Sequence, residues 1–163
     1  MSTAGAVDQA CLLDAHLHLP VQVAGHASGE VQGHAPGVTE IFPTEGQWWI
    51  NSGLTDDWEL VASLAAANRN VRGFVGVHPW QVEELCSAGG ALSPGGALSA
   101  GDAAAGWLAE LRGLLLANPG LGIGEIGLDG SGRHRKSLAA QREVLRLQLG
   151  LAAELGRPVS LHC

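Results

Sequence analysis

Charged side chains and cysteines are scarce in this 163-residue chain, and no apolar run is long enough to cross a membrane. The first ten residues lack the basic start and apolar centre of a secretion signal, so we predict no export. The three cysteines, Cys11, Cys86 and Cys163, form no close pair and are odd in number, which indicates a reduced compartment without a disulfide framework. These absences predict a cytoplasmic or nuclear protein.

Positive charge is also in the minority. The formal net charge is −7 at pH 7, so no overall positive field attracts nucleic acid or anionic lipid. A phosphate-bearing substrate would therefore need bound cations or a local basic patch. Hydrophobic residues make up 46% of the chain and charged residues 15%, a balance that predicts a folded protein rather than a disordered one. The length suits a single domain over residues 1–163.

Apolar runs alternate with helical patterns along the chain. We predict strands at Leu12–Leu19, Val38–Phe42, Val71–Val77, Leu121–Ile126 and Pro158–Cys163. We predict helices at Asp56–Asn68, Asp102–Ala117 and Ser137–Leu155. The stretches 25–37 and 87–101 are rich in small residues and are interpreted as surface insertions. Strands that alternate with helices predict a parallel α/β sheet, either doubly wound or closed as a barrel.

The first predicted strand carries the most informative pattern. Alternation along a strand places Asp14, His16 and His18 on one face. The bases of the two imidazoles then lie roughly 7 Å apart, which allows both to converge on one divalent ion. Taken alone, the two histidines are better read as polar residues at the mouth of a strand. Three later segments give the metal interpretation its weight.

These later segments also end in ligand-type residues. His78 follows the third predicted strand, Glu125 and Asp129 lie at the end of the fourth, and His162 lies at the end of the fifth. In parallel α/β folds the carboxyl ends of the strands carry the site. Glu125 lies in a segment that otherwise reads as buried, where a carboxylate needs a metal or a basic partner. Imidazole with carboxylate suits zinc, manganese, iron, or magnesium aided by water.

The order and spacing of these motifs carry a resemblance to a known family. The motifs are Asp-Ala-His-Leu-His from Asp14, Gly-Val-His-Pro-Trp from Gly76, Gly-Glu-Ile-Gly-Leu-Asp from Gly124 and Leu-His-Cys from Leu161. The chain resembles the TatD-related metal-dependent hydrolases, the TatD-type deoxyribonucleases, from Leu12 to Cys163. Gln141 and Gln148 also match the family pattern. The resemblance implies a (β/α)8 TIM barrel of the metal-dependent hydrolase type, truncated here after about five strands.

The resemblance also implies an activity and a set of ligands. It implies a deoxyribonuclease or phosphodiesterase that uses two divalent ions (Zn, Mn or Mg) to activate water, with DNA or another phosphodiester as substrate. His16 and His18 would bind the first ion, Glu125 would bridge both ions and His162 would bind the second. His78 would lie near the substrate phosphate. Glu125 and His78 are therefore the predicted catalytic residues.

Other polar residues near the predicted strand ends have two readings. Asp14 and Asp129 are interpreted as hydrogen-bonding supports that orient a ligand or a loop. His78 fits a structural His-Pro-Trp turn about as well as a substrate contact. Arg133 begins a basic run that is either a solvated loop or a contact for substrate phosphates. Trp80 and Trp49 are candidates for base stacking.

The motifs cover about five strands, whereas a (β/α)8 barrel usually takes about 250 residues. The family has a further histidine after a sixth strand and an aspartate after the eighth, and we find neither within these 163 residues. We therefore expect the N-terminal part of a longer parent enzyme, and the functional prediction applies to that parent. Whether these residues are active alone is left open. An open barrel edge would also offer a surface for self-association.

Two alternatives to a nuclease remain open from the sequence. The same ligands would serve an amidohydrolase that cleaves an amide or an ester, because a ligand set does not distinguish phosphorus from carbon. A truncated barrel without catalysis, acting as an interaction protein, is the other alternative.

Overall fold

The computed structural model describes residues 13–18, 42, 46–87 and 103–162, and for residues 13–18, 86–87 and 103–105 it describes the backbone alone. Within this part of the chain, five strands form one sheet. The strands are β1 (Leu13–His18), β2 (Gln47–Asn51), β3 (Val71–Val75), β4 (Gly122–Gly127) and β5 (Val159–His162).

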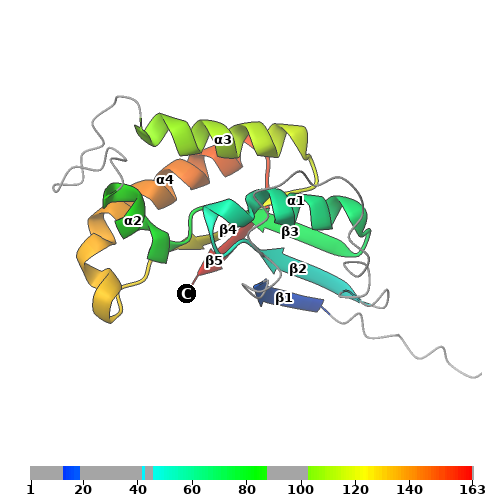
Figure 1. Cartoon of the computed structure of the whole chain (residues 1–163), viewed down its shortest axis with the longest axis horizontal. Coiled ribbons are helices and arrows are strands. Elements are labelled where there is room, and N and C mark those ends of the chain that lie inside the picture. The colour runs from blue at the N-terminus through cyan, green and yellow to red at the C-terminus, as the bar shows by residue number, and fades with distance from the viewer. Residues whose placement is uncertain (1–12, 19–41, 43–45, 88–102, 163) are drawn as a thin grey trace, which may run out of the picture.

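Helices follow or precede these strands in alternation. The α-helices are α1 (Trp58–Ala67), α2 (Val82–Ser87), α3 (Ala103–Ala117) and α4 (Leu138–Leu155). Three short 3-10 helices are η2 (Thr55–Asp57), η3 (Pro79–Gln81) and η4 (Gly132–Ser137). In Figure 1, α1, α3 and α4 lie on one side of the sheet. None of the helices in the described residues combines the length and the apolar character needed to span a membrane.

The strand order decides between the two sheet types left open by the sequence. The order in the sheet is β1-β2-β3-β4-β5, and each neighbouring pair is parallel. A doubly wound sheet reverses its order at a switch point, whereas the strands of a β/α barrel follow one another in sequence. The predicted α/β barrel topology is therefore confirmed over the five strands that the structure describes.

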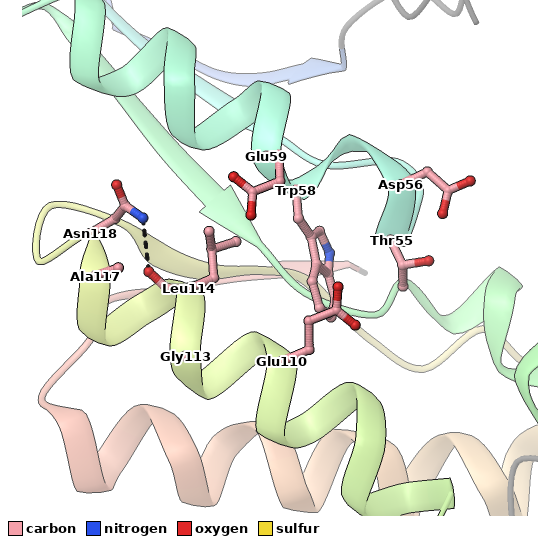
Figure 2. Close-up of a pocket in the computed structure, with 9 residues that line it drawn as sticks. All are labelled: Thr55, Asp56, Trp58, Glu59, Glu110, Gly113, Leu114, Ala117 and Asn118. Carbon is pink, nitrogen blue, oxygen red and sulfur yellow. Dashed lines mark hydrogen bonds between the residues drawn. The ribbon is translucent and has the colours of Figure 1, made fainter. Parts of the chain in front are cut away.

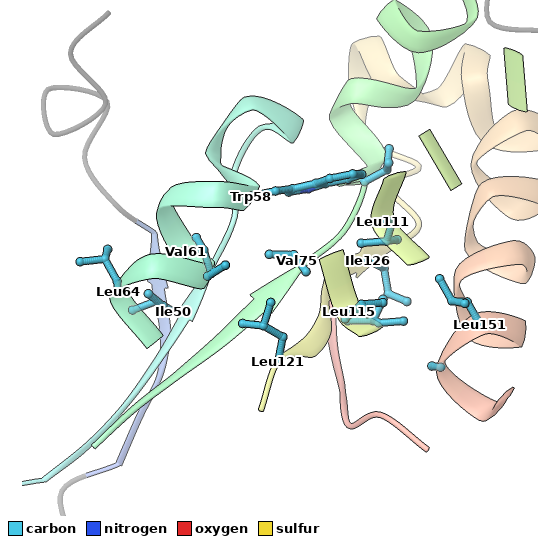
Figure 3. Packing of buried hydrophobic residues seen from close by; sticks show 14 of the residues in the cluster. Ile50, Trp58, Val61, Leu64, Val75, Leu111, Leu115, Leu121, Ile126 and Leu151 are labelled. Atoms are coloured by element: carbon cyan, nitrogen blue, oxygen red, sulfur yellow. The ribbon is translucent and has the colours of Figure 1, made fainter. Parts of the chain in front are cut away.

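The face of the sheet that meets the helices is apolar. Ile50, Val75 and Ile126 from three strands pack in one cluster with residues of α1, α3 and α4 (Figure 3). Their contacts across the layer are Val61 and Leu64 of α1, Leu111 and Leu115 of α3, and Leu151 of α4. Since side chains alternate along a strand, residues next to these project to the opposite face, which in a barrel is the interior.

Helix α4 is the best-predicted element, because its buried residues recur at helical spacing. Val144 and Leu151 face the core together with two glutamines, and the helix ends at Gly156 in the left-handed conformation at φ 62°. The predicted start is refined by the structure. Ser137 precedes the helix, but its hydroxyl donates to the carbonyl oxygen of His134 at 2.9 Å and caps no amide of α4.

One predicted strand lies mostly outside the described residues, and one strand of the sheet was not predicted. Of the predicted strand Val38–Phe42, residues 38–41 lie outside the described residues, and Phe42 is a buried core residue that belongs to no strand. The second strand of the sheet is β2, which the sequence analysis missed along with the short helix α2. The other predicted strands and helices occur within two residues of their predicted bounds. The stretches 25–37 and 87–101, predicted as insertions, lie outside the described residues except for Ser87, which is the last residue of α2.

The packing of α3 on the sheet yields a stability prediction. Leu111→Ala should lower the free energy of unfolding by about 2–5 kcal/mol, because Leu111 is fully buried and its truncation leaves a cavity. Leu116→Ala, the same change on the same helix at a side chain that is 56% exposed, should cost less than about 0.5 kcal/mol. Urea unfolding measures both, and equal effects would contradict the described orientation of α3.

Candidate metal centre

Three ligand-type side chains meet where three neighbouring strands end. His78 follows β3, Glu125 lies in β4 and His162 is the last residue of β5. Because these strands are adjacent and parallel, their carboxyl ends lie at one edge of the sheet. The ligand atoms of the three residues all lie within 4.8 Å of one another. The structure thus brings together three of the residues that the sequence analysis placed at strand ends.

The contacts within this cluster are short. Nδ1 of His162 lies 2.7 Å from Oε1 of Glu125 and 3.2 Å from Nε2 of His78. Nε2 of His78 lies 3.9 Å from the same carboxylate oxygen. Glu125 is 1% exposed and His78 is 5% exposed, so these two members of the cluster are screened from bulk water. In such surroundings electrostatic interactions are stronger than at the protein surface.

The donor set fits a divalent ion. Imidazole nitrogens and carboxylate oxygens bind zinc at about 2.0–2.2 Å, so two ligands of one ion lie at most about 4.4 Å apart. The separations between the ring nitrogens of His78 and His162 and the Glu125 carboxylate fall in or near this range. A buried carboxylate between two imidazoles is also the combination expected for a bound cation.

The turn after β3 fixes which nitrogen His78 turns toward the cluster. His78 begins η3, with Pro79 at the first helical position, and its Nδ1 accepts a hydrogen bond from the backbone N–H of Trp80 at 3.2 Å. A ring nitrogen that accepts a hydrogen bond carries no proton, so a neutral His78 carries its proton on Nε2. The His-Pro-Trp turn is therefore structural, and it also points an N–H donor at Glu125 and His162.

Gln148 of α4 holds the end of β3 in place. Its carboxamide oxygen accepts the backbone N–H of Val77 at 2.7 Å, and its Nε2 donates to the Val77 carbonyl oxygen at 3.2 Å. Gln148 is fully buried, and Val77 immediately precedes His78. This paired contact satisfies a peptide group where the strand pairing ends. It therefore sets the position of the His78 backbone.

Gln141, two turns earlier on α4, does the same for the end of β4. Its oxygen accepts the backbone N–H of Asp129 at 2.8 Å, and its Nε2 lies within 3.2 Å of the carbonyl oxygens of Asp129 and His134. Gln141 is 1% exposed. In the sequence, both glutamines stand out only as matches to the family pattern. Their regular seven-residue spacing on one buried helix face was the signal that could have predicted a shared structural role.

Asp129 links the cluster to the aromatic ring beside it. Its carboxylate accepts the indole N–H of Trp80 and the backbone N–H of Ser131, and it lies 4.0 Å from Nε2 of His162. Hydrogen bonds from the side chain and backbone of Ser131, and then from Trp80, hold the pKa of Asp129 well below its usual range. The charged form of Asp129 is therefore favoured, and its carboxylate acts as a hydrogen-bond acceptor that supports neighbouring groups.

Two polar residues at the end of β2 were not singled out by the sequence analysis. Ser52 is fully buried, and its Oγ accepts the backbone N–H of Gly76 at 3.3 Å and lies 3.5 Å from the carbonyl oxygen of Gly124. Asn51 is 1% exposed, and neither heteroatom of its carboxamide has a hydrogen-bond partner among the described residues. Because β2 was not predicted, nothing in the sequence marked these two residues as lying at the carboxyl end of a strand.

For most of the remaining predicted residues, the structure describes the backbone but not the side chains. Asp14, His16 and His18 lie in β1, and His18 is in register with Asn51, but their side chains lie outside the described residues. The assignment of the β1 histidines to a first ion stays a prediction. Arg133 lies exposed in η4, which directly follows the loop after β4.

A pocket of about 420 Å³ lies elsewhere, between α1 and α3 (Figure 2). It is lined by Thr55, Asp56, Trp58, Glu59, Glu110, Gly113, Leu114, Ala117 and Asn118. None of the three clustered residues lines it. The indole N–H of Trp58 is already bonded to the Gly76 carbonyl oxygen at 3.0 Å. The three clustered residues therefore lie at the strand ends and not in this pocket.

The chain matches the model of a known protein family. The family model described as TatD related DNase matches residues 13–163. No curated protein matches the chain.

Gln148→Leu should destabilise the protein and disturb the cluster. The change leaves the buried N–H and carbonyl groups of Val77 unpaired, at a cost of about 1–3 kcal/mol each. Gln81→Leu is the matched control, because the side-chain oxygen of Gln81 is buried without a partner among the described residues. Thermal unfolding should separate the two variants, and a Gln148 variant as stable as the Gln81 variant would refute the anchoring role.

Asn51→Leu should have the opposite effect and stabilise the protein. A buried carboxamide without partners costs about 1–3 kcal/mol of desolvation, so its replacement by a similarly sized apolar group should raise the melting temperature. Asn118→Leu, which removes a bond from Nδ2 to the Leu114 carbonyl oxygen at 3.0 Å, should lower it. Calorimetry of the two variants tests the pair, and a loss of stability at both positions would show that Asn51 is bonded in solution.

Proposed function

Because this chain belongs to the TatD related DNase family, we propose that it cleaves phosphodiester bonds of DNA with the help of two divalent ions bound at the carboxyl ends of its strands. The family is one of metal-dependent hydrolases that act on nucleic acid. The proposal adds the substrate, the number of ions and the residues that serve them. The observation that carries it is the convergence of His78, Glu125 and His162.

Glu125 and His162 are the proposed ligands of one ion. The Glu125 carboxylate is buried against Nδ1 of His162, so both present donor atoms to the same point. A second ion would be held by His16 and His18 of β1 and bridged by Glu125, since β1 ends at the same edge of the sheet. Bound ions of this kind activate water and stabilise the charge that develops on the phosphate oxygens.

His78 has a different proposed role from the ligands. Its Nδ1 is occupied by the Trp80 N–H, which leaves Nε2–H as a donor that faces the cluster. Such a donor suits a phosphate oxygen of the substrate, where negative charge increases in the transition state. We therefore assign His78 to the substrate and not to an ion.

The remaining polar residues support this arrangement. Asp129 stays ionised and lies 4.0 Å from Nε2 of His162, a position from which it can orient that ring. Asp14 is proposed to support the histidines of β1 in the same way. Arg133 is proposed to contact a substrate phosphate. Neither a cytoplasmic or nuclear location nor self-association through a barrel edge is needed for this chemistry, and both stay proposals from the sequence.

The two roles predict different behaviour of two variants. Glu125→Ala should abolish zinc or manganese binding and reduce DNA cleavage by more than about 100-fold, because even changes to outer partners of metal ligands cost about 10- to 100-fold. His78→Ala should bind the ion with near-normal affinity but lower kcat by about 100-fold. Titration calorimetry with each metal and steady-state cleavage of a labelled oligonucleotide measure the two quantities.

Each competing function has its own outcome in this experiment. Metal binding with turnover of amides or carboxylic esters but not of DNA would favour an amidohydrolase. Tight metal binding without turnover of any substrate would favour a non-catalytic interaction protein. Cleavage of DNA that survives Glu125→Ala would reject the assigned role of Glu125.

A further inference from the structure

Trp80 is the most exposed large aromatic side chain beside the cluster. It is 53% exposed, although the two histidines that it contacts are buried or nearly so. Its ring meets those of His78 and His162 edge to face, with centroid distances of 4.8 Å and 5.9 Å. Tryptophan combines a large apolar ring with a polar N–H and is enriched at binding interfaces for that reason. This one presents apolar surface to solvent directly beside the proposed ligands.

The exposed ring is also held firmly. The indole N–H is bonded to the charged carboxylate of Asp129, and the imidazole of His134 is stacked on the ring at 5.5 Å with an interplanar angle of 8°. Gln141 in turn holds the backbone of both Asp129 and His134. The platform is therefore oriented before any ligand arrives, which lowers the entropy cost of binding.

Positive charge lies next to this platform. Arg133, Arg135 and Lys136 are exposed on η4, the same short helix that carries His134. The chain as a whole has a net charge of −7, so this run is a local exception. A flat apolar ring beside exposed cations is the combination that binds a nucleobase by stacking and its flanking phosphates by charge.

We propose that Trp80 is a stacking subsite for the nucleobase adjacent to the cleaved phosphate, with the cations of η4 contacting the flanking phosphate. This inference rests on the proposed nuclease function and names a substrate subsite for it. The stacked base is expected to lie next to the proposed metal centre, because the Trp80 ring contacts both His78 and His162. Recognition by stacking is tolerant of base identity, since every base offers a π-face.

The test compares bases and protein variants together. Oligonucleotides that carry a normal nucleotide, or an abasic residue, on either side of the cleaved phosphate are cut by the wild type, Trp80→Ala, Trp80→Phe and the control Trp107→Phe. The wild type and Trp107→Phe should lose about 5- to 100-fold in kcat/KM on one of the abasic substrates, the usual contribution of one stacked base. Trp107 is partly buried against the core, so its replacement leaves the platform intact.

On the normal substrate, kcat/KM of Trp80→Ala should be lower than that of the wild type by a similar factor. On the abasic substrate, kcat/KM of Trp80→Ala should fall no further. Trp80→Phe should keep most of the discrimination, because a flat ring remains. If the abasic and Trp80→Ala losses multiply, or if neither abasic substrate is cut more slowly, the stacking subsite is rejected. Equal rates of the wild type and Trp80→Ala on the abasic substrate would show that the centre itself is intact.

A binding measurement separates this proposal from the proposed activity. In EDTA, without cleavage, the oligonucleotide should quench the tryptophan fluorescence of the wild type, and Trp80→Phe should abolish that quenching although four other tryptophans remain of the five in the chain. Quenching in a protein that never cleaves DNA would support the subsite while the nuclease proposal fails. Quenching unchanged in Trp80→Phe would overturn the subsite, whatever the activity.

Discussion

The paired hydrogen bonds between the Gln148 carboxamide and the peptide group of Val77 are the contact on which the arrangement of the site depends. A strand that leaves its sheet exposes backbone groups, and here those groups are buried and need partners. Gln148 supplies both partners at once, and Gln141 repeats the contact at Asp129. One rigid helix thus aligns the ends of β3 and β4. Since His78 and Asp129 lie at or next to the held residues, the relative position of the imidazole and the carboxylate is set by α4.

Two glycines of β4 allow β5 to lie close to that strand. A Cβ atom on Gly124 would lie 2.6 Å from Cβ of Ser160, and one on Gly127 would lie 2.9 Å from Cβ of His162. These two positions let β5 lie close against β4, and His162 thereby comes within 2.7 Å of Glu125. The glycines before and after the glutamate therefore act together with the two glutamines. The glycines set the distance between strands, while the glutamines set where the strands end.

Periodicity and motif order predicted most of this fold, but some features depend on contacts that a sequence does not display. The alternation of strands and helices predicted a parallel sheet, and only the sequential strand order distinguished a barrel from a doubly wound sheet. β2 was missed because Trp49, which lies in it, was considered only as a candidate for base stacking. The convergence of His78, Glu125 and His162 followed from their places at strand ends. The tautomer of His78 could not be predicted, because it depends on a hydrogen bond from the backbone N–H of Trp80, 2 residues away. The orientation of the Trp80 ring could not be predicted either, because its indole N–H is bonded to Asp129, 49 residues away.

The hydrogen bonds that the two glutamines make with the segments directly after β3 and β4 involve only backbone atoms of Val77 and Asp129. Replacing the side chain of Val77, or of residues in the basic run after Asp129, removes none of these hydrogen bonds. The loop that would meet substrate can therefore change its sequence during evolution while the cluster keeps its geometry. Related enzymes could diverge in what they bind at this loop and still inherit the same chemistry, provided that the two amides on α4 are retained.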